Sequence, residues 1–446
     1  MLSSTSFRMP RAALALPVLA FAALALPTMA HAASAAAPGS FDVEAATRAW
    51  LDTLQGPARA KSDAYFEGGY WLTLWGTLVS VLTDGLLLRF ALSARMRDMA
   101  GRVFKRRAGV LWLTSVLYLL WGAVITFPWA VYTGFFREKQ YGLANQDFAG
   151  WLGDSLKSTM VTLVIGPLLI MAIYAVIRRS PRNWWIGGTL VMGLFTTVGI
   201  MLAPVYIAPM FNKYVELPAG PVRDRIVAMA HSKGIPADHI YLFDASKQTK
   251  RISANVSGIG PTVRISLNDN LLNRTTPAET AAVVGHEMGH YVLGHSRNMV
   301  LGVTAIAALF LFLTSRLAPW LIARNGARWG VADMADPASL PVLGIVVAVL
   351  GMLATPLTNS LIRVQESQAD AFGLDVAKEP DGFASTAMKL SEYRKIEPGA
   401  LEEILFYDHP SGRTRVHMSM QWKKDHVANP VMVVPPPMPQ DDPHKP

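Results

Sequence analysis

Six long apolar segments constrain the fold more than any other feature of this sequence. Each holds about 20 mostly apolar residues, the length that a helix needs to cross the hydrocarbon core of a bilayer. They cover residues 69–88, 110–132, 159–177, 184–206, 299–321 and 340–362. The composition agrees, because 51% of the 446 residues are hydrophobic and only 16% are charged. Soluble domains carry a charged share of about 25%. We therefore expect a multi-pass membrane protein, mostly α-helical.

Basic residues predict the orientation of these segments. Arginine and lysine gather between the first and second segments, between the third and fourth, and in residues 317–339. Such loops stay on the cytoplasmic side. The 134–158 loop, residues 207–298 and the C-terminal region should then face the other side. Since the formal net charge of +9 arises from short clusters and not from one face, we predict a lipid bilayer as partner and no nucleic acid.

The N-terminus has the pattern of a targeting segment. Arg8 and Arg11 precede an apolar stretch over 12–26, and Ala30-His31-Ala32 then places small residues where a signal peptidase cuts. We predict a signal peptide over 1–32. The alternative is an uncleaved first membrane helix, for which the apolar part is short.

A metal-binding motif follows a strong helix-start signal. Thr276 and Glu279 have the spacing of a capping box, so a helix should begin between them. Within it lies the pattern H-E-x-x-H, formed by His286, Glu287 and His290. Residues four apart share a helix face, so both imidazoles can bind one zinc ion while the glutamate lies beside a bound water. The chain has no cysteine, so imidazole and carboxylate must supply every ligand.

A catalytic zinc needs a third protein ligand. Glu366 is the best candidate, because it directly follows the last apolar segment, where a helix leaving the membrane can return to the motif. Asp370 lies four residues later on the same face, placed to accept a hydrogen bond from a ligating histidine. His295 is close to the motif, but we leave it out of the ligand set because Glu366 fits better.

The remaining sequence predicts a small α+β unit inserted into the helical bundle. A helix should start at Pro221, and strands should cover 239–243, 252–257 and 262–267, with a Gly- and Pro-containing hairpin turn between the last two. The fold class is thus a multi-pass helical membrane bundle with an inserted zincin-like domain. Its predicted parts are 1–32 (signal), 33–68 (extramembrane), 69–206 (four membrane helices), 207–298 (catalytic), 299–362 (two membrane helices), 363–428 (C-terminal part of the catalytic domain) and 429–446 (disordered tail).

Taken together, these motifs resemble the M48 metallopeptidases, in particular the Ste24 type that cuts prenylated CAAX proteins. The resemblance rests on the H-E-x-x-H motif, on the stretch Glu366-Ser367-Gln368-Ala369-Asp370-Ala371-Phe372, and on His409-Pro410 followed by Arg415. Residues 206–211 and 264–269 also look like segments of that family. The likeness covers most of the chain.

The resemblance implies a role for each site residue. It makes His286, His290 and Glu366 the ligands of one zinc ion per chain, Glu287 the general base, and Asp370 a supporting residue. His409 or Arg415 would add a second donor to the oxyanion, although both also fit as surface contacts. The strand over 253–257 would be the edge on which the substrate adds.

Two departures from the family change the expected substrate. The family's usual Asn-Ala-Tyr on the edge strand reads Ser253-Ala254-Asn255 here, which puts side-chain contacts to substrate in doubt. A signal-like segment replaces the first membrane helix, which would place the catalytic domain on the periplasmic side of a bacterial inner membrane. Membrane-associated or misfolded polypeptides then become more plausible substrates than prenylated ones.

Three functions are compatible with these residues. The leading hypothesis is a Ste24-type zinc endopeptidase acting on membrane-associated or prenylated-like polypeptides, with zinc-activated water and Glu287 as general base. The second is an HtpX-like quality-control protease with the same site residues. The third is a non-catalytic membrane channel or chaperone, which requires that no metal be bound.

Overall fold

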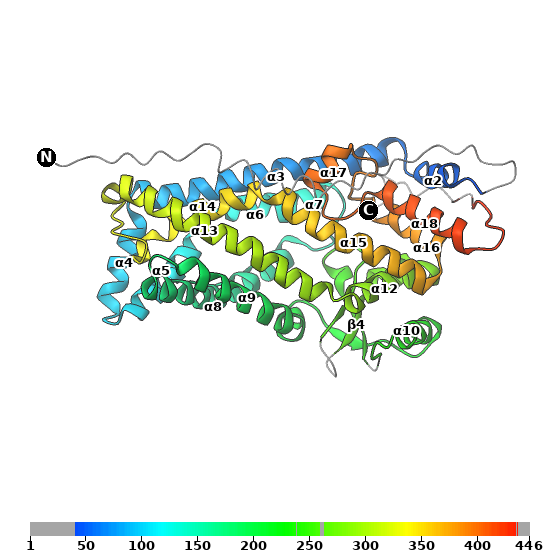
Figure 1. Ribbon diagram of the computed structural model, residues 1–446, viewed down its shortest axis with the longest axis horizontal. Coiled ribbons are helices and arrows are strands. Elements are labelled where there is room, and N and C mark those ends of the chain that lie inside the picture. Colours follow the sequence, from blue (N-terminus) through cyan, green and yellow to red (C-terminus); the bar gives the residue numbers. More distant parts are fainter. Residues whose placement is uncertain (1–40, 238, 259–262, 434, 436–446) are drawn as a thin grey trace. The chain divides into compact units, whose positions relative to one another are not determined.

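The computed structural model describes residues 41–237, 239–258, 263–433 and 435. The predicted signal peptide over 1–32 and most of the predicted C-terminal tail lie outside the described residues. The compact unit that contains every predicted site residue begins at Val43. In it, long helices run side by side, and the strands gather at one end with α10, α12, α16 and α18 (Figure 1). The predicted fold class, a helical membrane bundle with an inserted small domain, is confirmed.

Five helices are long and apolar enough to cross a membrane within the described residues. They are α3 (Gly56–Arg89), α5 (Arg107–Ile125), α8 (Phe148–Arg179), α9 (Trp184–Leu202, continued to Met210 by the short helices η2, Ala203–Ile207, and η3, Ala208–Met210) and α13 (His295–Trp329). Each overlaps one of the first five apolar segments. Large apolar side chains such as Leu190 (71% exposed) project outward from these helices, as expected where lipid instead of water surrounds them.

The sixth apolar segment forms two helices instead of one. Helix α14 covers Leu340–Leu353 and α15 covers Thr355–Ala377, with a bend of 53° between them. Pro356 explains the bend, because proline has no N–H to donate to the preceding turn and its ring crowds that turn's carbonyl. The bend redirects the chain from the bundle toward the domain that holds the H-E-x-x-H helix.

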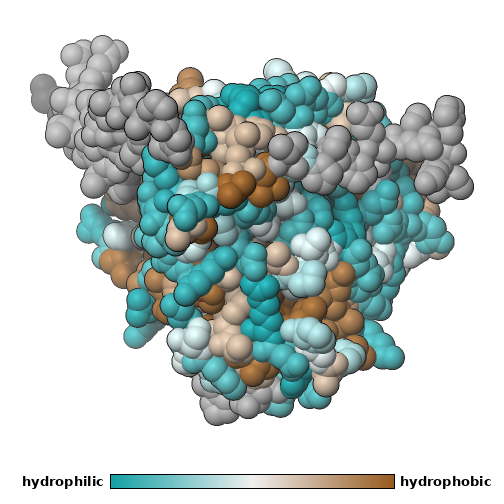
Figure 2. Space-filling view, turned by 90° about the vertical axis from the view of Figure 1, so that its right-hand side faces the viewer, coloured by the Kyte–Doolittle hydropathy of each residue, from teal (hydrophilic) through white to brown (hydrophobic). Residues whose placement is uncertain are grey.

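Shorter helices connect and cover these elements. Hydrophilic side chains predominate over the end of the unit where α10, α16 and α18 lie (Figure 2). The shorter elements are α2 (Val43–Leu51), α4 (Leu92–Val103), α6 (Phe127–Val131), η1 (Tyr132–Phe136), α7 (Arg137–Gln140), α10 (Pro221–Ser232), η4 (Ala245–Lys247), α11 (Asp269–Arg274), α12 (Pro277–Val292), η6 (Pro337–Ser339), α16 (Pro380–Leu390), α17 (Ala400–Phe406) and α18 (Gly412–His426).

A four-stranded sheet forms the β part of the inserted domain. Its strands are β1 (Tyr214–Glu216), β2 (Ile240–Phe243), β3 (Ala254–Ser257) and β4 (Arg264–Asn268), in the order β1-β2-β4-β3. The pairs β3/β4 and β1/β2 are antiparallel, and β2/β4 is parallel. Strands β2, β3 and β4 match the three predicted strands. Strand β1 was not predicted, because its three residues are too few to show an alternating pattern. The hairpin turn at 259–262 lies outside the described residues.

Strand β3 lies at an edge of the sheet. Its neighbour Ser253 directs both backbone groups toward β4, because its carbonyl accepts from Asn268 N at 3.0 Å and its N–H donates to the Asn268 side chain at 3.1 Å. Backbone groups alternate along an antiparallel strand. Ala254 therefore turns its N–H and C=O toward the open edge.

Candidate metal and catalytic site

The helix that carries the H-E-x-x-H motif begins where its capping box predicts. Thr276 Oγ1 accepts a hydrogen bond from Glu279 N at 3.3 Å, and Glu279 Oε2 accepts one from Thr276 N at 2.6 Å. The Glu279 carboxylate is buried and also binds Lys389 Nζ on α16 at 2.8 Å. One glutamate thus starts α12 and fixes it to the neighbouring helix.

Small residues bring α12 unusually close to α15. A Cβ atom added at Gly285 would lie 3.0 Å from the carbonyl oxygen of Gly373, and one at Gly289 would lie 3.0 Å from Cα of Ala369. These positions repeat every four residues on both helices, so the two backbones meet along one face, as in small-xxx-small crossings. The close approach places residues of α15 directly opposite the two histidines of α12.

Three predicted ligands meet at this crossing. His286 Nε2 lies 3.0 Å from His290 Nε2 and 3.2 Å from Glu366 Oε2, and His290 Nε2 lies 3.5 Å from Glu366 Oε1. Tetrahedral zinc with bonds of about 2.0–2.1 Å separates its ligand atoms by about 3.3 Å. Among the described residues, this is the one group of three or more possible ligands in metal-binding range.

The Glu366 carboxylate supports the fit of a cation. Its Oε2 atom is buried, and although His286 Nε2 and His409 Nε2 each lie 3.2 Å away, no described residue meets hydrogen-bond geometry with it. A buried carboxylate oxygen without a partner is costly. A positive ion bonded to this oxygen and to both imidazoles would remove that cost, so the donor set suits the metal that the motif predicts.

Asp370 and Arg415 support His286 from behind. Asp370 is fully buried and its Oδ1 lies 2.7 Å from His286 Nδ1, where it accepts the proton of a ligating imidazole. Arg415 holds this carboxylate through Nε at 2.9 Å and Nη2 at 2.5 Å. Burial lowers the pKa of His286, but Asp370 and Glu366 together raise it to about 10. Two carboxylates therefore make this position strongly favourable for positive charge.

His290 has a support of its own, which the sequence reasoning missed. His295 Nδ1 lies 2.9 Å from His290 Nδ1, and His295 Nε2 lies 3.1 Å from Gln368 Oε1. If His290 binds metal through Nε2, its Nδ1 carries the proton and donates it to His295, whose own proton then faces Gln368. Gly294, with φ of 67°, turns the chain so that His295 folds back onto the motif. His295 therefore lies beside the group of possible ligands formed by His286, His290 and Glu366 and is not one of its members.

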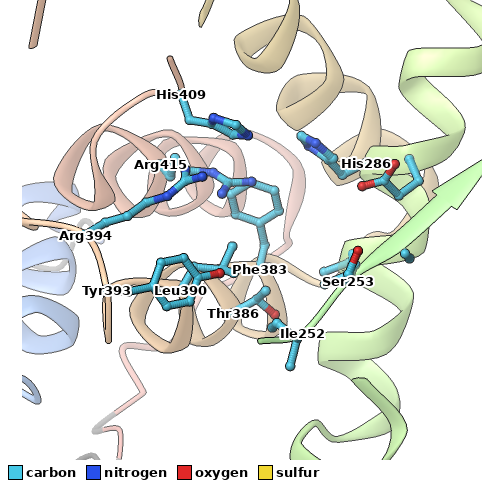
Figure 3. Close-up of a pocket in the computed structure, with 14 residues that line it drawn as sticks. Ile252, Ser253, His286, Phe383, Thr386, Leu390, Tyr393, Arg394, His409 and Arg415 are labelled. Carbon is cyan, nitrogen blue, oxygen red and sulfur yellow. The ribbon is translucent and has the colours of Figure 1, made fainter. Parts of the chain in front are cut away.

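A cavity of about 260 Å³ opens beside the ligands. Ile252 and Ser253 form one wall, and Leu390 and Tyr393 lie on the facing wall (Figure 3). Glu287 lines the cavity as well. Burial raises the pKa of its carboxyl group, and His286 and His290 partly offset that shift. A carboxylate whose pKa is raised is a better proton acceptor than an ordinary one, which suits a general base.

The two residues with open roles, His409 and Arg415, make different contacts with the ligand set. His409 Nε2 lies 3.2 Å from Glu366 Oε2, and its Nδ1 lies 2.8 Å from Asp408 Oδ1. It borders the cavity, across from His286 (Figure 3). Arg415 also borders the cavity, but its guanidinium is largely engaged by Asp370. This geometry favours His409 over Arg415 as a donor to substrate.

Comparison with known proteins agrees with this site. Residues 216–422 match the model of peptidase family M48, and residues 51–213 match the CAAX prenyl protease N-terminal model, described as five membrane helices. The chain belongs to peptidase family M48. As a Ste24-type member, it is a multi-pass integral membrane protein and a metalloendopeptidase that acts on polypeptides.

Individual relatives support the same assignment. The chain is 27% identical over 315 residues to an uncharacterized metalloprotease of Bacillus subtilis, covering 70% of this chain and 73% of that protein. It is 26% identical over 364 residues to the CAAX prenyl protease 1 homolog of Arabidopsis thaliana, covering 78% of this chain and 84% of that protein. The crystal structure of S. mikatae Ste24p shares the fold, with a TM-score of 0.69 and 19% identity over 85% of this chain and 94% of that chain.

Proposed function

We propose that this metalloendopeptidase is a zinc enzyme with His286, His290 and Glu366 as ligands. The observation that carries the proposal is that the buried Oε2 of Glu366 accepts no hydrogen bond, although it lies 3.2 Å from His286 Nε2. Without cysteine, the ligands of a transition metal here are imidazole and carboxylate. Two imidazoles and a carboxylate with an open position are typical of catalytic zinc. A zinc ion held there would supply Lewis acidity, activating water and polarising the scissile carbonyl.

The protein's own residues would carry the proton transfers. Glu287 lies in the cavity beside the ligands and would take the proton of the attacking water, then deliver it to the leaving amine. His409, which also lines the cavity, would donate a hydrogen bond to the oxygen of the carbonyl as negative charge develops. Arg415 and Asp370 would hold His286 in the orientation and tautomer that leave Nε2 free to bind.

The edge of the sheet would hold the substrate backbone. Ala254 turns its peptide groups toward the open edge of β3, and the same residue lines the catalytic cavity. A polypeptide in extended form can add there as a further strand, with its main chain bound irrespective of sequence. The scissile peptide would then pass between β3 and the ligand set.

The substrates we propose are membrane-associated or lipid-modified polypeptides. Tyr393 and Arg394 border both the catalytic cavity and a second cavity of about 540 Å³. This second cavity shares Tyr70 and Phe406 with an apolar cavity of about 380 Å³ between α3, α15 and α17. Three adjoining cavities thus lead from the site to the bundle, where an apolar segment would lie. Relatives named CAAX prenyl proteases are consistent with such substrates.

Broad-specificity quality control of membrane polypeptides is the second candidate. It is favoured by backbone binding at β3 and by a periplasmic catalytic domain in a bacterial inner membrane, which is the orientation that the loop charges predict. Cleavage of one peptide with and without a prenyl group separates the two candidates. Strong preference for the prenylated form supports the first, and equal rates support the second.

The proposed site is tested by paired substitutions. Glu366→Ala should lose zinc and activity together, because one of three ligands is removed. Glu287→Gln should retain about one equivalent of zinc while turnover falls by about 10²- to 10⁴-fold. If Glu366→Ala keeps full zinc and activity, the third ligand lies elsewhere. If the wild type binds less than about a tenth of an equivalent after chelator-free purification, the chain is not a zinc enzyme.

A further inference from the structure

A cavity with several hydroxyl groups and one carboxylate in its lining lies inside the membrane-spanning part of the protein, apart from the catalytic cavity. It has a volume of about 490 Å³ and shares no lining residue with the catalytic cavity. Helices α3, α5, α8 and α14 surround it. Besides apolar residues and one carboxylate, Asp84, it is lined by seven hydroxyl side chains, those of Ser80, Thr83, Tyr118, Thr126, Ser158, Thr159 and Thr162.

Asp84 is the only charged side chain of this lining among the described residues. It is 7% exposed, and its Oδ2 accepts one long hydrogen bond, of 3.3 Å, from the hydroxyl of Tyr118. In the described part of the chain, no lysine, arginine or histidine comes within ion-pair distance of it. Ionised residues inside a membrane usually pair with an opposite charge or border a water-filled path. Here the protein supplies no opposite charge.

The packing of α14 reserves space for this carboxylate. A Cβ atom at Gly344 would collide with Oδ2 of Asp84 and would lie 2.5 Å from the hydroxyl oxygen of Tyr118. Any side chain at this position would therefore displace both polar groups. The glycine keeps the carboxylate at the cavity wall instead of letting an apolar side chain fill the space.

The hydroxyl groups make the lining a surface of hydrogen-bond acceptors. Thr83, Thr126, Thr159 and Thr162 each donate their proton to the carbonyl oxygen four residues earlier, at 2.8 to 3.0 Å. A hydroxyl that has donated its single proton presents only lone pairs to its surroundings. Together with the carboxylate, the lining repels anions and favours a ligand that is positively charged.

We propose that this cavity binds a small monovalent cation, with Asp84 as its counter-charge. A single carboxylate among neutral oxygens suits one positive charge, whereas calcium sites usually gather several carboxylates. A water molecule takes about 30 Å³ of liquid volume, so the cavity accommodates the ion together with part of its water shell. The hydroxyl lone pairs bind these waters and the ion.

Direct cation titration tests the proposal. Purified protein in detergent is titrated with sodium, potassium or methylammonium chloride, replacing N-methyl-D-glucamine chloride at constant ionic strength. The readouts are the thermal midpoint and the linewidth of sodium NMR, and zinc content verifies folding. The wild type should gain thermal stability and broaden the sodium signal in a saturable way, as mass action requires.

Three variants make the result specific. Asp84→Asn keeps the shape of the side chain, but it should abolish the saturable cation response or raise the half-maximal cation concentration at least tenfold. Gly344→Ala should have the same effect, because the added methyl group displaces the Asp84 carboxylate. Asp98→Asn is the matched control, because Asp98 is exposed on α4 and already paired with Arg97 at 2.8 Å; it should respond as the wild type does. A wild type without a saturable response overturns the proposal, and so does an equal response in Asp84→Asn. If Asp84→Asn does not fold, Gly344→Ala and the wild-type titration decide.

Discussion

Replacing Gly373 with alanine tests whether close helix packing builds the metal site. Gly373 lies on α15 opposite the start of the H-E-x-x-H motif. A Cβ atom there would lie 2.7 Å from the backbone nitrogen of His286 and 3.0 Å from its Cα atom. These are backbone atoms at a buried crossing, so no flexible side chain can move aside. The two helices must separate.

The size of the separation follows from the contact distance. Ordinary van der Waals contact begins at 3.4 Å, so α12 and α15 must move apart by about 0.7 Å. Metal–ligand distances tolerate deviations of about 0.2 Å. Since Glu366 moves with α15 and the histidines with α12, we expect zinc affinity to fall by at least about tenfold, equal to about 1.4 kcal/mol. The free energy of unfolding of the zinc-free protein should fall by about 1–3 kcal/mol.

Competition with a chelator of known affinity measures the zinc dissociation constant, and denaturant unfolding measures stability. Gly153→Ala is the control, because no atom lies within 4 Å of a Cβ added at that position of α8. It should keep wild-type zinc affinity and activity. A Gly373→Ala protein that binds zinc within twofold of the wild type would refute the claim that the glycine contact sets the ligand geometry.

Three further predictions concern the helix cap, the support of the ligands and the topology. Glu279→Gln should lower the free energy of unfolding by about 1–3 kcal/mol at neutral pH. Burial raises the pKa of Glu279, but Lys389 and its other hydrogen-bond donors lower it below the usual value. The charge therefore stabilises the fold above the unfolded pKa of about 4.3, and wild type and variant should converge as pH falls through the lower folded pKa; a constant difference would contradict this. Asp370→Asn should lower zinc affinity by about 10- to 100-fold in chelator competition, and an unchanged affinity would argue against its orienting role. A reporter fused after Lys250 should be active on the periplasmic side and one near Lys105 in the cytoplasm, and the reverse pattern would overturn the predicted orientation.

Local signals made the catalytic helix and the third ligand predictable. The capping box of Thr276 and Glu279 and the four-residue spacing of the histidines both act within one helix, so sequence spacing determines which atoms face each other. Glu366 was proposed because it directly follows the last apolar segment once the H-E-x-x-H motif required a carboxylate, and Asp370 because it lies four residues later on the same helix face. The strands β3 and β4 were predicted from their alternation on either side of a glycine-rich turn.

Other features depend on contacts between distant residues and could not be predicted this way. The pairing of His290 with His295 and Gln368 requires the turn at Gly294 and the arrival of α15 beside it. In the sequence, the glycines of α12 and α15 cannot be told from other helical glycines. Their role depends on the contact between the two helices, which only the structure shows. The bend before Pro356 had a local signal, but membrane helices often tolerate proline without breaking, so hydropathy alone predicted one continuous segment.

The order of the ligands along the chain ties the metal site to the membrane bundle. His286 and His290 precede α13, whereas Glu366 follows the bend between α14 and α15. Helices α13 and α14 therefore separate the proposed third ligand from the first two along the chain. His295 is the first residue of α13 and contacts His290 at 2.9 Å. A movement of α13 would thus affect the proposed ligand His290 directly, while a movement of α14 would affect the proposed ligand Glu366 through α15. The membrane bundle is therefore part of the scaffold that positions the proposed ligands. Helix α12, with both histidines, is directly followed by α13, and helix α15, with Glu366, is directly preceded by α14.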